Sequence, residues 1–144
     1  MLIGEYTHTL DEKKRLSLPA SFRTQLGKGA VITRGLDQCL CIYSAASWKA
    51  ILAKTATLSM GAGDSRGFVR FLLSGAAPLA ADASGRVLIP EHLKQFAQLS
   101  SKVVFAGVGD RVEVWDHAAW TKYTKRIEGE GEQMAERLSA VGAL

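Results

Sequence analysis

Two short segments of the sequence place an arginine four positions after an aspartate. The first reads DEKKR at residues 11–15, and the second reads DASGR at residues 82–86. Lysine offers a point charge to a phosphate, and arginine can bind a phosphate or a guanine edge through two hydrogen bonds. A turn that carries such cations into solvent is suited to DNA. The residues that we predict to contact DNA are Lys13, Lys14, Arg15 and Arg86.

The two aspartates of these segments have a different predicted role. Because aspartate in a turn accepts hydrogen bonds from nearby backbone amides, we assign Asp11 and Asp82 mainly to loop shaping. A purely structural alternative is that the aspartates also pair with the arginines and that the lysines form an ordinary solvated loop. The second segment keeps a single cation, so the two sites are expected to be unequal.

No constellation of catalytic side chains is apparent in the sequence. The histidines, His8, His92 and His117, are scattered, and there is no zinc-protease motif, phosphate-binding loop or suggestive pair of carboxylates. We therefore expect no enzyme activity, no catalytic residue, no cofactor and no small-molecule substrate.

The two cysteines, Cys39 and Cys41, are separated by one residue. On a strand they would share a face but lie too close in sequence for a relaxed disulfide. No neighbouring residues complete a zinc-binding set, so the sequence predicts no metal site. We expect buried, reduced cysteines that pack as small apolar side chains.

The composition is that of a globular chain with a basic body. The 144 residues are 47% apolar and 22% charged, and the net charge is +4. Residues 1–111 hold 14 basic and 8 acidic side chains, whereas residues 112–144 hold 4 basic and 6 acidic ones. The basic excess therefore belongs to the body of the chain and is compatible with a polyanionic partner.

Membrane and export signals are not evident. No run approaches the roughly 18 apolar residues that a membrane span requires, and no basic segment leads into an apolar run near residue 1. The expected location is the cytoplasm, without a membrane partner.

An internal repeat covers much of the chain. At a shift of 71 residues, DEKKRLSLP aligns with DASGRVLIP, and at a shift of 72, VITRGLDQCLCIYSAASW aligns with VVFAGVGDRVEVWDHAAW. Modules of roughly 45–50 residues are too small to hold a full core alone. We therefore predict that two modules pack on each other about a pseudo-two-fold axis. The predicted divisions are a first module at residues 1–58, a linker and linking helix at 59–75, a second module at 76–127 and a C-terminal tail or helix at 128–144.

The same series of elements is expected in both modules. The runs IGEYTHT and APLAAD are extended, and short strands follow at residues 15–18 and 86–89. A proline then occupies the first position of a brief helix. A β-hairpin comes next, and Ser44 or Asp116 caps the helix after it.

Two further helices are expected outside the repeat. Asp64 could cap a linking helix after the loop SMGAGDSRG. Near the C-terminus the glycines of EGEGE are expected to break the helical pattern, after which Met134, Leu138 and Val141 line one side of a last helix. That apolar stripe indicates a contact with the same or a neighbouring subunit.

The segments LIGEYTHTLDEKKRLSLPASFR, DASGRVLIP and VEVWDHAAW together resemble the MraZ family of bacterial transcriptional regulators, which are built from two AbrB-like modules. The resemblance implies a mixed α+β fold, specifically a double-split β-barrel of swapped-hairpin type. It also implies ring-shaped homo-oligomers that associate with the nucleoid. The implied partner is double-stranded DNA, at direct repeats in the promoter of the family's own division and cell-wall gene cluster.

One residue departs from the family pattern. Lys14 stands where the family usually has glycine, which would permit a positive φ. Either Lys14 tolerates a strained turn or the turn has a different shape. A second function also stays open, because AbrB-like folds include antitoxin-like modules that sequester a partner protein.

Overall fold

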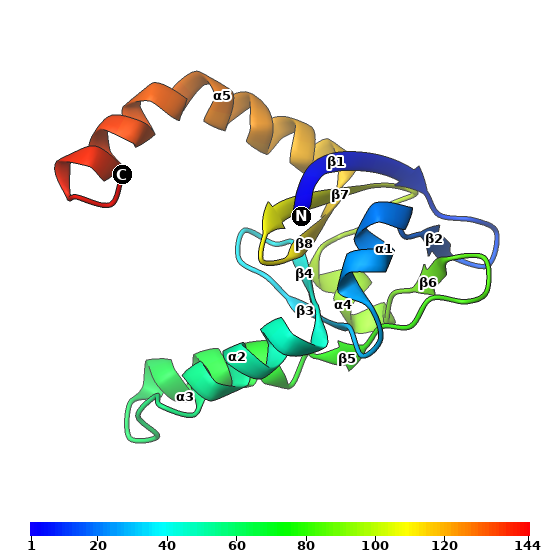
Figure 1. The fold of residues 1–144 in the computed structure, drawn as a ribbon, viewed down its shortest axis with the longest axis horizontal. Helices are drawn as coiled ribbons and strands as arrows, with labels where there is room; N and C mark the ends of the chain where they lie inside the picture. The colour runs from blue at the N-terminus through cyan, green and yellow to red at the C-terminus, as the bar shows by residue number, and fades with distance from the viewer.

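Eight antiparallel strands and five helices make up the computed structural model, which describes residues 1–144 (Figure 1). The strands are β1 (Leu2–Thr9), β2 (Arg15–Ser17), β3 (Val31–Arg34), β4 (Leu40–Tyr43), β5 (Ala77–Pro78), β6 (Arg86–Leu88), β7 (Lys102–Gly109) and β8 (Val112–Asp116). The helices are α1 (Ala20–Leu26), α2 (Ala45–Thr55), α3 (Gly63–Leu73), α4 (Glu91–Phe96) and α5 (His117–Ala140). The mixed α+β class is confirmed, with antiparallel strands forming the body.

The two halves of the chain exchange strands. The larger sheet has the order β1-β7-β8-β4-β3-β5, and the smaller sheet pairs β2 with β6. β1 therefore pairs with a strand of the second repeat, and β5 pairs with β3 of the first. Each module thus completes its sheet with the leading strand of the other.

A pseudo-two-fold axis relates the two modules, as the repeat predicts. Leu16 lies opposite Val87 in the small sheet, and Cys41 lies opposite Glu113 in the large one. These pairs are separated by 71 and 72 positions, which are the shifts of the sequence repeat. An antiparallel pair of equivalent residues lies on the axis that relates them, so both sheets are centred on one axis.

The main core lies between the two sheets and the short helices. Leu16 and Val87 from the small sheet and Phe22 and Leu93 from helices α1 and α4 are almost completely buried in it. Tyr6 of β1 meets Phe22 edge to face, with 5.2 Å between the ring centroids. The equivalent apolar residues of both repeats therefore fill one shared core.

A second apolar cluster covers the other face of the large sheet. Its buried members are Cys39, Cys41, Tyr43, Val104 and Trp115. The residues that pack against it from helices α2 and α5 are Trp48, Ile51, Trp120 and Tyr123. The β4 and β8 strands are consequently covered on both faces near the axis.

Two predicted helix caps are confirmed, whereas the two prolines stand one position earlier than predicted. The Ser44 side chain accepts a hydrogen bond from the N–H of Ser47, and the Asp116 side chain accepts one from Ala118, so both predicted caps are confirmed. Pro19 and Pro90, however, stand just before the first helical residue, with extended ψ angles of 134° and 143°. The proline ring fixes only φ, and its carbonyl can still accept the first bond of the helix from the N-cap position.

The expected break in the last helix is wrong. Helix α5 runs without interruption through residues 128–132 and projects away from the body (Figure 1). Each glycine in a helix interior costs about 1 kcal/mol relative to alanine, which surrounding glutamate, glutamine, methionine and leucine residues can offset. None of the five helices is long and apolar enough to cross a membrane.

Two smaller expectations also need correction. Ala62, not Asp64, is the N-cap of α3, and Asp64 lies within the first turn without a capping hydrogen bond. A carboxylate in the first turn favours the helix through its dipole, which does not require a cap. In the APLAAD run only Ala77 and Pro78 form a strand, because β3 offers partners to those two residues alone.

The continuity of α5 leads to a test of its two glycines. Nothing lies within 4 Å of the position that a Cβ atom would take at Gly129 or Gly131. We expect the double substitution Gly129→Ala/Gly131→Ala to favour this helix by about 2 kcal/mol and to slow amide hydrogen exchange in residues 125–140. Ala135→Gly is the matched control and should speed exchange there. Unchanged exchange in both variants would contradict a continuous helix.

Candidate nucleic-acid interface

The pairing of β2 with β6 brings the two Asp-x-x-x-Arg segments together. Arg15 lies opposite Leu88, and Ser17 lies opposite Arg86. The loops that precede these strands therefore lie side by side at one end of the body, far from the projecting α5 (Figure 1). The sequence predicts the two segments separately, and the fold joins them into one surface.

Four side chains in these loops form a crossed set of ion pairs. Within each loop the arginine Nε lies close to its own aspartate, at 2.9 Å for Arg15 and Asp11 and 3.1 Å for Arg86 and Asp82. Between the loops, the Nη1 atom of Arg15 lies 3.9 Å from Oδ2 of Asp82, and the Nη1 atom of Arg86 lies 3.8 Å from Oδ2 of Asp11. The arrangement obeys the pseudo-two-fold symmetry and links the modules electrostatically.

Each aspartate also organises the backbone of its own loop. The Asp11 Oδ1 atom accepts hydrogen bonds from the N–H groups of Lys13 and Arg15 at 2.9 and 2.8 Å. Asp82 accepts the equivalent bonds from Ser84 and Arg86. The bond from the Arg15 amide lowers the pKa of Asp11 below its ordinary value, and the Arg15 guanidinium lowers that pKa further. The Arg86 amide does the same for the pKa of Asp82.

The residue before each arginine adopts a left-handed backbone. Lys14 has a φ of +61°, and its counterpart Gly85 has a φ of +80°. A residue with a Cβ atom pays roughly 1–2 kcal/mol for this conformation. The turn therefore keeps the shape that glycine favours, and Lys14 tolerates the strain.

In the second loop the corresponding position faces a side chain of the first module. A Cβ atom at Gly85 would meet the guanidinium end of Arg23, which would have to move aside. That guanidinium also donates a hydrogen bond to the carbonyl of Leu18. Arg23 of the first module thus packs against the loop of the second, and the corresponding Lys94 instead pairs with Glu91.

The predicted DNA-contacting residues differ in their exposure and in the ion pairs that they form. Lys13 and Lys14 are exposed and take part in no ion pair. Arg15 and Arg86 have side chains that are 27% and 34% exposed, with Nε committed to aspartate. The structure therefore places all four residues at one end of the body but gives the lysines and the arginines different surroundings.

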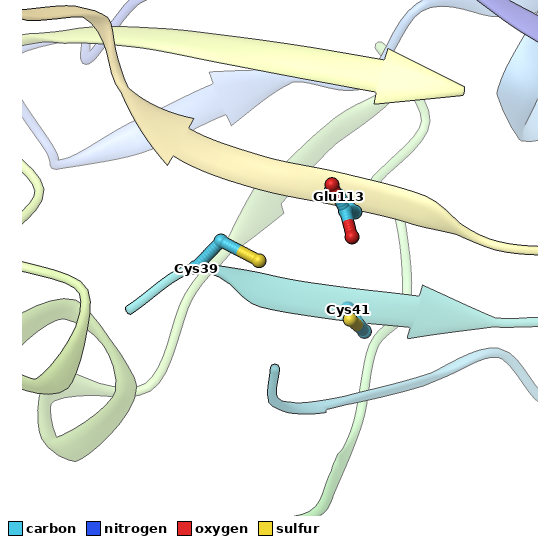
Figure 2. Close-up of side chains that lie close together, drawn as sticks. All are labelled: Cys39, Cys41 and Glu113. Atoms are coloured by element: carbon cyan, nitrogen blue, oxygen red, sulfur yellow. The ribbon is translucent and has the colours of Figure 1, made fainter. Parts of the chain in front are cut away.

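A second group of chemically capable side chains lies near β4. Cys39 and Cys41 are buried and form no disulfide, as expected for reduced cysteines, and the Cys39 thiol donates a hydrogen bond to the carbonyl of Leu36 at 3.1 Å. Glu113 of β8 joins them, and the two sulfur atoms and a Glu113 oxygen lie within 4.8 Å of one another (Figure 2). Contact with the Cys41 thiol raises the pKa of the Cys39 thiol, and burial raises it further.

The involvement of Glu113 was missed from the sequence. The repeat contains the necessary signal, because Glu113 aligns with Cys41 at the shift of 72 residues. Equivalent residues near a two-fold axis become neighbours when the strands that carry them pair. The pairing of β4 with β8 is what turns the alignment into a contact.

Duplicated modules, exchanged strands and two equivalent charged loops define a chain of the pseudo-symmetric, two-module class. A family model described as "MraZ protein, putative antitoxin-like" matches the chain twice, at residues 1–71 and 72–141. Proteins named transcriptional regulator MraZ are 45% identical in Caldanaerobacter subterraneus subsp. tengcongensis and 44% identical in a Thermoanaerobacter species, over 96% of both chains in each comparison. One from Syntrophomonas wolfei is 42% identical over 99% of both chains. The chain belongs to the MraZ family.

The lowered aspartate pKa values make a prediction about acid stability. A carboxyl group whose pKa is lower in the folded state stabilises the fold above its unfolded value, near 3.8, and that stabilisation is lost as the pH falls through the folded pKa. Asp11→Asn should therefore lower the free energy of unfolding near pH 7, and its difference from the parent should shrink toward about pH 2.

Urea unfolding at several pH values measures this difference. Glu132→Gln is the control, because Glu132 is exposed in the middle of α5, takes part in no ion pair and lies far from either end of the helix, so this variant should follow the parent at every pH. A deficit for Asp11→Asn that stayed constant down to about pH 2 would show that the charge of Asp11 does not stabilise the fold.

Proposed function

We propose that the chain is a sequence-specific DNA-binding regulator of transcription and that the paired loops at residues 11–15 and 82–86 contact the DNA. The observation that carries the proposal is the union of both loops at one end of the body by the β2–β6 pair. The names of the relatives, which are those of transcriptional regulators, support the same reading. The proposal assigns no catalytic step to the chain.

The loop residues would have different roles in binding DNA. Asp11 and Asp82 hold the loop backbones and the Nε atoms of the arginines. Because the aspartates already orient both guanidinium groups, the outer nitrogens of Arg15 and Arg86 would be positioned to bind a phosphate or a guanine edge. Lys13 and Lys14 would add sequence-independent attraction to the phosphate backbone.

One protomer offers few cations, so we propose that several act together. A ring-shaped homo-oligomer would present several loop pairs to direct repeats, and linked weak sites can gain about 10²–10⁴-fold in avidity. The proposed repeats lie in the promoter of the chain's own division and cell-wall gene cluster, which places the protein in the cytoplasm at the nucleoid. We further propose that the exchanged sheets belong to the double-split β-barrel type of AbrB-like modules.

A protein-sequestering role is the second candidate. Leu138 and Val141 at the end of α5 are 47% and 78% exposed, and they could bind a partner protein. Purification from native lysate separates the two candidates, because a stoichiometric foreign protein would favour sequestration. A self-associated protein without one, bound to the upstream DNA, would favour regulation.

Lys14→Gly tests the electrostatic part of the DNA proposal without damaging the loop. Glycine relieves the strain of the positive φ, so the folded state should be at least as stable as the parent. Loss of one cation should weaken binding to the upstream DNA and reduce the slope of log affinity against log salt by about 0.9 per DNA-bound loop pair. Titration by fluorescence anisotropy at several salt concentrations measures both.

Lys125→Ala on α5 is the matched control for the loss of one charge. Residue 125 lies on the projecting helix, away from the loops, and its loss should leave the salt slope unchanged. Equal slopes for Lys14→Gly and the parent would exclude Lys14 from the DNA contact.

Substitution of Arg15 tests specificity. Arg15→Ala should abolish discrimination between the repeat and a scrambled sequence, because the bidentate contact is lost. Arg15→Lys keeps the positive charge but not the planar guanidinium, so it should bind both DNAs while discriminating poorly. Footprinting and competition binding measure the ratio. If Arg15→Ala discriminated as the parent does, the role assigned to Arg15 would be wrong.

A further inference from the structure

The group of Cys39, Cys41 and Glu113 has no part in the proposed DNA contact. It lies on the outer face of the large sheet, whereas the charged loops extend from the small sheet. Cys39 and Cys41 are 0% and 3% exposed, and the Glu113 side chain is 14% exposed. Two thiols and a carboxylate at this depth are chemically unusual in an otherwise apolar cluster.

We propose that Cys39, Cys41 and Glu113 bind one zinc ion, with a water molecule from the adjacent cavity as the fourth ligand. Cysteine thiolates and a carboxylate are ligands that zinc accepts, and tetrahedral coordination by three protein atoms leaves one position open. Sulfur ligands also favour zinc over magnesium or calcium, which prefer oxygen.

The positions of the ligand atoms suit a tetrahedral site after small movements. Zinc lies about 2.3 Å from sulfur and 2.0–2.2 Å from carboxylate oxygen, so its ligands are roughly 3.3–3.8 Å apart. The three atoms already lie within 4.8 Å of one another and point into a common space (Figure 2). Side-chain rotations that move the ligand atoms about 1 Å closer together would complete the site.

The absence of a side chain at Gly35 creates the space that the sulfur atoms occupy. A Cβ atom at this position would lie 2.7 Å from the Cys41 sulfur and 2.9 Å from the Cys39 sulfur. The backbone that follows β3 can therefore approach both thiols closely, because Gly35 has no side chain. Any larger residue at position 35 would press on both sulfur ligands.

Neighbouring donors hold the carboxylate in place and balance its charge. Arg111 donates to one Glu113 oxygen at 3.1 Å, and the Trp115 indole N–H donates to the other at 3.1 Å. Such outer contacts orient metal ligands, and each carboxylate oxygen retains a further lone pair. Two thiolates and Glu113 carry three negative charges, which a divalent ion and Arg111 together would neutralise.

A cavity of about 510 Å³ connects the group with solvent. Cys41, Glu113 and Arg111 lie in its wall, beside apolar residues of α2 and α3. This opening supplies an entry path for the ion and room for the fourth ligand. Cys39 is fully buried and does not line this cavity.

The location on the pseudo-two-fold axis gives the ion a structural consequence. Cys41 belongs to the first module and Glu113 to the second, and they face each other across the β4–β8 pair. A bound ion would join the modules at the centre of the large sheet. Binding to the folded state alone would raise the midpoint of thermal unfolding.

The test begins with the reduced full-length protein after removal of metals with a chelator. Zinc titrated by calorimetry should bind at one ion per chain, and cobalt in its place should produce the strong absorption of thiolate-to-metal charge transfer. Zinc should also raise the midpoint of thermal unfolding. A titration of the reduced parent without heat, absorption or thermal shift would overturn the proposal, whatever the variants do.

Variants then locate the ion. Cys41→Ser and Glu113→Gln each remove a direct ligand, so each should lower zinc affinity by more than the roughly 10–100-fold that follows the loss of an outer contact. Asp110→Asn is the matched control, because Asp110 pairs with Arg111 but lies outside the ligand group, and it should bind zinc as the parent does. Circular dichroism checks that each variant is folded.

Cys39→Ser/Cys41→Ser provides the second decisive result. Parental zinc affinity in this double variant would place the ion elsewhere and overturn the proposal. None of these measurements involves DNA, so their outcome is independent of the proposed regulatory function.

Discussion

The exchange of leading strands between the two modules is the interaction on which the rest of the structure depends. β1 makes an eight-residue antiparallel pair with β7, which lies almost a hundred residues later in the sequence. Without that pair, each module would lack an edge of its sheet and would expose part of a core that is too small to be stable alone. The shared core between the sheets therefore forms only when both modules are present.

The exchange also determines where the charged loops lie. Each loop begins at a strand that is held in the sheet of the opposite module and ends at the β2–β6 pair. The backbone is thus fixed at both ends by the other half of the chain, and the crossed contacts between Arg15 and Asp82 and between Arg86 and Asp11 follow from that proximity. Ion pairs that are about a third exposed stabilise a fold only modestly, so we regard them chiefly as orienting contacts.

The repeat explains why much of the fold could be predicted from the sequence. Most expectations could be checked in two copies, and the short strands, the hairpins and the caps at Ser44 and Asp116 were confirmed in both. Repetition did not prevent every error, because both prolines stand one residue before their helices and β5 covers only two residues. The other errors fall outside the repeat. The glycines at 129 and 131 suggested a break, but strong helix formers surround them. Asp64 suggested a cap, but the helix begins one residue before it.

The candidate sites were less predictable because their geometry depends on long-range pairing. The loops were found from their residue types, yet nothing local indicates that Arg15 reaches Asp82. Similarly, Glu113 could not be placed beside Cys41 until the pairing of β4 with β8 was known. Side-chain chemistry is a local property of a sequence, whereas the distance between two side chains is a property of the topology.

The positions at which the two repeats differ are therefore the informative ones. Residues that both copies retain, such as the aspartate and arginine of each loop, satisfy demands that the symmetric fold makes twice. Lys14 replaces the easier glycine of the second loop at a cost in backbone strain, which points to a benefit outside the folding of the loop. Cys41 faces Glu113 across the axis where a symmetric fold requires only two residues that pack. A duplicated chain thus separates the requirements of its fold, which are repeated, from chemistry that only one copy carries.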